Sequence, residues 1–161
     1  MREHWAEEFV SYTEKRDTPC NRIRHVNGWL ETVDIANSRC FIKSVSFDER
    51  RRHYFLGVDP GKLSERGDAV VLCGGRKTQL SDIFVIPWKQ FFAAIEKSET
   101  INTYRDREYF QYKFYVRERE GVWTASFRGG DQPILDVTDK RFEPKNAAAY
   151  LRSMECRSSA K

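Results

Sequence analysis

Basic and aromatic side chains are concentrated in two segments of the chain, a combination that can bind a polyanion. Residues 39–62 contain six Lys or Arg and three acids, and residues 101–119 contain five Lys or Arg and three acids. Basic side chains neutralise phosphates, and aromatic faces stack on exposed bases. The residues expected to make such contacts are Arg50, Arg51, Arg52 and His53 in the first segment, and Tyr104, Arg105, Arg107, Tyr109, Tyr112 and Lys113 in the second. The alternative is an ordinary strand with a charged outer face and an aromatic inner face.

A second group of charged residues, Glu8, Asp34 and Lys43, lies on three predicted elements. Apolar side chains recur at i, i+4 and i+7 from Trp5, which predicts an amphipathic helix with Glu8 at the edge of its apolar stripe. Period-two alternation predicts two strands, one carrying Asp34 and the next carrying Lys43. The elements run over residues 3–16, 29–35 and 40–47.

This order of elements resembles that of the restriction-endonuclease-like nucleases, the PD-(D/E)xK superfamily. The matching stretches are Val33-Asp34-Ile35, Cys40-Phe41-Ile42-Lys43 and Asp82-Ile83-Phe84-Val85-Ile86-Pro87-Trp88. The resemblance covers about residues 3–97 and implies a Mg²⁺ site in which Asp34 is the metal ligand. It also implies that Lys43 steadies the developing charge and that Glu8 is the helix acid found in many members. In such a site Mg²⁺ polarises the scissile phosphate and helps to deprotonate the attacking water.

The sequence departs from that family pattern at Phe41. The family places an acid, or sometimes Gln, two residues before the lysine, and phenylalanine cannot bind a metal. Glu31 and Asp48 are the nearest acids that could replace it. Otherwise the site is degenerate, or the alignment of Asp34 and Lys43 with the motif is shifted.

The remaining pattern predicts an α+β (mixed α/β) fold in a single domain spanning residues 1–161. A central sheet of about five to seven strands is expected, flanked by N-terminal, middle and C-terminal helices. Residues 3–97 form the predicted nuclease-like core, and residues 98–161 form a β-hairpin and a C-terminal helix added to it. Further predicted strands cover 20–26, 53–58, 69–73, 82–87, 104–119, 122–128 and 134–137. Helices are predicted over 88–97 and from Pro144 onward.

Composition excludes several other classes of protein. With 40% hydrophobic and 32% charged residues, the chain is not typical of a disordered segment. Its apolar runs are much shorter than the roughly 20 residues of a membrane-spanning helix, and its polar start predicts a cytoplasmic protein with no membrane partner. The four cysteines lack metal-site spacing and are expected to be free thiols.

These observations lead to three competing hypotheses of function. The first is a DNA-binding protein of nuclease-like architecture, for which no cofactor is expected. It would hold phosphates with its Arg cluster and contact bases with its aromatic segment. The alternatives are a Mg²⁺-dependent DNA endonuclease using Asp34 and Lys43, and a protein-interaction domain. A homodimer or a larger restriction or repair assembly is the expected context.

Overall fold

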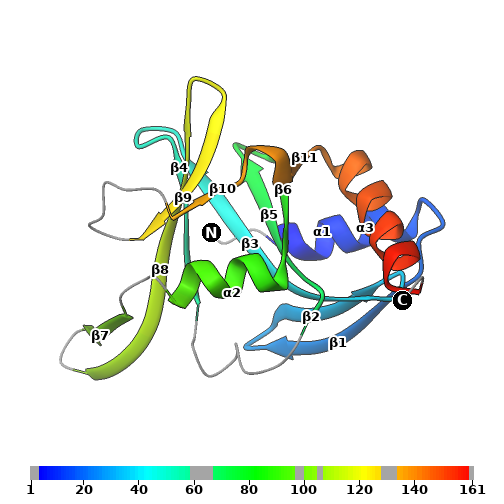
Figure 1. The fold of residues 1–161 in the computed structure, drawn as a ribbon, viewed down its shortest axis with the longest axis horizontal. Coiled ribbons are helices and arrows are strands. Elements are labelled where there is room, and N and C mark those ends of the chain that lie inside the picture. Colours follow the sequence, from blue (N-terminus) through cyan, green and yellow to red (C-terminus); the bar gives the residue numbers. More distant parts are fainter. Residues whose placement is uncertain (1–3, 59–66, 97–99, 105–106, 128–133, 160–161) are drawn as a thin grey trace.

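The computed structural model describes residues 4–58, 67–96, 100–104, 107–127 and 134–159, and its strands form one curled sheet (Figure 1). The helices are α1 (Trp5–Glu14), α2 (Trp88–Glu96) and α3 (Pro144–Ser159), with a 3-10 turn η2 (Thr138–Lys140). The strands are β1 (Cys20–Val26), β2 (Trp29–Ile35), β3 (Ser38–Asp48), β4 (His53–Val58), β5 (Ala69–Arg76), β6 (Gln79–Pro87), β7 (Thr100–Tyr104), β8 (Arg107–Arg119), β9 (Val122–Phe127), β10 (Leu135–Asp136) and β11 (Arg141–Phe142).

The long strand β3 joins the two halves of the sheet. Its first part pairs antiparallel with β2 and parallel with β5, whereas its last two residues pair antiparallel with β4. The sheet order is therefore β10-β9-β8-β4-β3-β5-β6-β11, with β1 added to β2 and β7 added to β8. Strands β4, β8 and β9 form the part of the sheet seen at the left of Figure 1, away from α1 and α3. We call these three strands the ribbon.

Two hydrophobic cores lie on opposite sides of the sheet, because side chains alternate along β3, β5 and β6. Val45, Leu72 and Phe84 point into the first core, which also contains Phe91 of α2. Neighbouring residues in the same strands point into the second core, which is covered by α1 and α3. The first core also contains Tyr54, Leu56, Val58, Phe114, Val116, Trp123 and Ala125 of the ribbon. Strands buried on both faces explain the continuous apolar runs of β5 and β6.

A glycine pair lets two large aromatic side chains approach the same point of β5 from opposite sides. A Cβ at Gly74 would lie 2.6 Å from the ring of Tyr54, and a Cβ at Gly75 would overlap the indole of Trp5. The sequence pattern predicts a turn over residues 74–77, but Gly74 and Gly75 belong to the strand and the turn comes later. These glycines therefore serve close packing rather than chain reversal.

The α+β class and the three helices agree with the sequence prediction, but the predicted number of strands is wrong. The strands β1 to β11 outnumber the expected five to seven because all of them, the short β7, β10 and β11 included, join one sheet. Within residues 98–161, β8 pairs with β4 over six positions, so this part of the chain continues the sheet. Among the described residues, no helix is both long and apolar enough to span a membrane.

Candidate nucleic-acid interface

The structure places Asp34 and Lys43 on the same side of the sheet but in separate interactions. Asp34 lies opposite Arg39 in the β2–β3 pair, and Arg39 Nε is 2.5 Å from Asp34 Oδ1. Lys43 lies four residues further along β3, about 13 Å away at the usual rise per strand residue, and donates a hydrogen bond to the carbonyl of Gly57. Each side chain is therefore held by a structural partner of its own.

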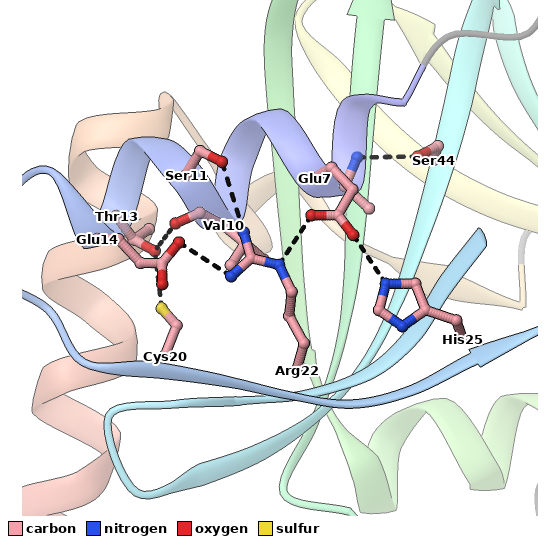
Figure 2. A network of polar contacts seen from close by, with 10 residues as sticks. Glu7, Val10, Ser11, Thr13, Glu14, Cys20, Arg22, His25 and Ser44 are labelled. Carbon is pink, nitrogen blue, oxygen red and sulfur yellow. Dashed lines mark hydrogen bonds and ion pairs between the residues drawn. The ribbon is translucent and has the colours of Figure 1, made fainter. Parts of the chain in front are cut away.

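Glu8, the third residue of this group, is exposed on α1, which packs against the opposite side of the sheet. The acid that α1 directs toward the sheet is Glu7, whose carboxylate contacts Arg22 at 2.9 Å and His25 at 3.0 Å (Figure 2). Burial raises the pKa of Glu7, but the hydrogen bonds from Arg22 and His25 outweigh this effect and leave its pKa below the usual value. Arg22 also contacts Glu14, so the network ties β1 to α1.

The other acids that could complete a metal site also have structural roles. Glu31 is buried and lies 3.6 Å from Arg24. Asp48 accepts hydrogen bonds from the backbone N–H groups of Arg50 and Arg51. Within the described ranges, no three His, Cys, Asp or Glu side chains gather as a metal-binding group.

The predicted basic cluster lies in the turn between β3 and β4, where its members point in different directions. Arg50 and Arg51 are exposed, whereas Arg52 contacts Glu118 at 3.3 Å. His53 is buried and packs against the ring of Tyr115 at 4.6 Å. Burial, followed by the charge of Arg117, lowers the pKa of His53.

Most side chains of the predicted aromatic segment lie outside the described part of the structure. Arg105 lies outside the described residues. Tyr104, Arg107, Tyr109 and Tyr112 belong to β7 and β8, but their side chains lie outside the described part of the structure. Lys113 is the member whose side chain is described, and its Nζ lies 5.9 Å from the centre of the Phe55 ring.

Lys113 belongs to a surface of the ribbon that points away from the first core. Because Tyr54, Phe114 and Trp123 face that core, the alternate residues of the same strands face outward. This side of the ribbon, which we call the ribbon face, consists of His53, Phe55, Lys113, Tyr115, Arg117, Arg119, Val122, Thr124 and Ser126. His53 and Ser126 are buried within it. None of these described side chains is acidic.

Rings and cations alternate across the ribbon face. Phe55 and Tyr115 are paired across β4 and β8, and their ring centres are 5.5 Å apart. Lys113 lies beside Phe55, and the guanidinium of Arg117 is 4.9 Å from the centre of the Tyr115 ring. These distances are typical of cation–π contacts. The face therefore presents two aromatic rings, each with a cation beside it.

An ion cluster around the buried Asp82 supports the ribbon from its inner side. Asp82 is 1% exposed and accepts hydrogen bonds from the Tyr54 hydroxyl and from Arg141 Nε, the latter at 2.6 Å. Arg76 Nε lies 3.3 Å from the same carboxylate, and its guanidinium also contacts Glu118. The cluster connects β4, β5, β6, β8 and β11, so it holds the ribbon against the rest of the sheet.

Sequence reasoning missed Phe55, Arg117 and the Asp82 cluster as parts of a site. Period-two alternation within β4 and β8 could have placed Phe55 on one face of its strand and Arg117 on one face of the other. It could not show that the two strands pair. Asp82 is a single acid in an apolar strand, and its partners Tyr54 and Arg141 are distant in the sequence, so no local pattern marks it.

Three cysteines are free thiols, as predicted: Cys20 is half-buried, and Cys40 and Cys73 are buried. Burial raises the pKa of Cys40 and Cys73, which keeps both protonated at neutral pH. The side chain of Cys156 lies outside the described residues.

When the chain is compared with protein-family models, curated proteins and solved structures, none of the three comparisons finds a match.

Proposed function

We propose that the protein binds DNA through the ribbon face. The observation that carries this proposal is the grouping of Lys113 and Arg117 with two aromatic rings on a face whose described side chains include no acid. The exposed Arg50 and Arg51 adjoin this face, because the turn that carries them leads into His53 at the start of β4. Asp48 pairs with His53 at the same edge and lies 4.0 Å from Arg51 Nε. Complementary charge attracts the phosphates, and the aromatic rings add contacts that a simple counterion lacks.

The proposal retains the DNA-binding hypothesis but assigns the DNA contacts to a different set of residues. Arg52 pairs with Glu118 on the inner side of β8, and His53 is buried against the ring of Tyr115. The phosphate contacts are therefore assigned to Arg50, Arg51, Lys113 and Arg117. A nuclease centre at Asp34 and Lys43 gains no support from their separate ion pair and hydrogen bond.

The test measures DNA affinity over a range of salt concentrations by fluorescence anisotropy. The double variant Lys113→Gln/Arg117→Gln removes two cations and keeps part of each apolar stem. The slope of log affinity against log salt concentration is expected to be smaller in magnitude by about 1.4 to 1.8. Each of the two lost phosphate contacts contributes about 0.7 to 0.9 to that slope.

The matched control is Lys145→Gln/Arg152→Gln, which removes the same charge from exposed positions on α3. This control is expected to keep the wild-type slope. Equal slopes for the two double variants, or an affinity that does not change with salt, would contradict the proposal. Absence of DNA binding at low salt would instead favour a protein-interaction domain.

A further inference from the structure

The ribbon face exposes the aromatic ring of Phe55. Phe55 is 44% exposed, whereas its neighbours Tyr54 and Leu56 are almost fully buried in the first core. Burying a phenylalanine side chain contributes about 1.5–3 kcal/mol relative to leaving it in water. Phe55 forgoes part of that contribution, and its ring is available to a ligand.

The surroundings of Phe55 fit a ligand that carries both flat apolar groups and negative charge. Tyr115 provides a second ring, with the two ring planes inclined by 47°. Lys113 and Arg117 are on either side of Tyr115 along β8, each two positions, or about 7 Å, away from it. A strand of nucleic acid has the corresponding alternation of bases and phosphates.

Paired and unpaired DNA offer different groups to such a surface. A duplex stacks its bases internally and shows their edges in the grooves, where Arg, Lys, Asn and Gln side chains read them. The major groove admits a two-stranded β-ribbon, whereas three paired strands share the ribbon face. Stacking on an aromatic side chain requires a base that is free of the duplex.

We infer that the ribbon face binds single-stranded DNA, with an unpaired base stacked on Phe55 and phosphates contacting Lys113 and Arg117. This inference rests on the proposed function and adds the strandedness of the ligand. Tyr115 provides the neighbouring ring, and its position is supported by Arg117 on one side and by His53 beneath it.

The first test compares Phe55→Leu with Phe92→Leu, using a single-stranded oligonucleotide of about 16 nucleotides. Phe92 is a matched control because it is 40% exposed and lies on α2, which packs against the inner side of the ribbon. Phe55→Leu is expected to weaken binding by about 5- to 150-fold, the range for loss of one stacked base. Phe92→Leu is expected to bind like the wild type. Equal effects of the two substitutions would overturn the inference.

The second test uses the wild-type protein with a duplex of the same sequence and with an abasic strand of the same length. Weaker binding to both ligands supports the inference, because the duplex hides its base faces and the abasic strand has none. Equal or tighter binding to either one overturns it while retaining DNA binding. Failure to bind any of the three oligonucleotides overturns the proposed function itself.

Discussion

The Asp82 cluster predicts a large loss of stability when a single charge is removed. Asp82→Asn keeps the volume of the side chain and leaves Arg76 and Arg141 without their shared carboxylate. Removing one partner of a buried ion pair costs about 3–5 kcal/mol. The side chains of Arg76 and Arg141 are 29% and 37% exposed, so water partly compensates their charges. We therefore expect the lower end of that range, about 3 kcal/mol.

A second substitution tests the cluster from the ribbon side. Tyr54→Phe removes the hydroxyl that donates to Asp82 and leaves the ring in the first core. Loss of a hydrogen bond to a charged group costs about 1.5–3 kcal/mol. The double variant is expected to lose less than the sum of the two single losses, because both substitutions remove the same contact.

The free energy of unfolding is measured by urea denaturation, with thermal melts as a second readout. A loss of about 3 kcal/mol corresponds to a fall in Tm of about 6–12 °C for a protein of this size. The control Asp34→Asn breaks the more exposed ion pair with Arg39 and is expected to cost no more than about 1 kcal/mol. If Asp82→Asn stays within about 0.5 kcal/mol of the wild type, as surface substitutions do, the cluster has no stabilising role.

Three further outcomes are expected. Gly75→Ala should lower the free energy of unfolding by about 1–3 kcal/mol or more, because its Cβ overlaps Trp5; unchanged stability in urea denaturation would refute that packing. The pKa of His53 is lowered from 6.5 in the folded state, so at low pH the unfolded state binds more protons and stability falls as pH decreases through about 6.5. His53→Gln should flatten this part of the stability–pH curve, and an unaltered slope would contradict the assignment. The pKa of Glu7 is lowered from 4.5, so its contribution is present above pH 4.5 and is lost at lower pH. Glu7→Gln should reduce the acid-dependent loss of stability, whereas an identical loss would exclude Glu7 as its source.

Most secondary structure could be predicted because its causes are local. The turn dipeptide Asn27-Gly28 separates β1 from β2, and both residues adopt positive φ values. The first residues of α2 and α3 also agree with the predicted boundaries. The prediction failed at Gly74 and Gly75 because a glycine pair is typical of turns, and only the two rings packed on either side explain its place in a strand.

The candidate site could be predicted only in part. Lys113 belongs to the proposed interface, and the exposed Arg50 and Arg51 adjoin it. All three could be predicted because basic and aromatic residues are close to them in the sequence. The group of Glu8, Asp34 and Lys43 follows from the order of elements, which does not specify the side of the sheet or the partner of each side chain. The structure separates the group because α1 covers the opposite side and because Arg39 and Gly57 satisfy Asp34 and Lys43.

The amino-acid sequence by itself determined the α+β class, the positions of the helices and which strand residues share a face, because helical and strand periodicities are properties of neighbouring residues. Only the tertiary structure decided which strands pair. The pairing of β4 with β8 sets Phe55 beside Tyr115, although the two residues are far apart in the chain. The same long-range pairing gathers Tyr54 and Arg141 around the buried Asp82. Such contacts depend on how the whole sheet closes over its cores, and no local pattern encodes them.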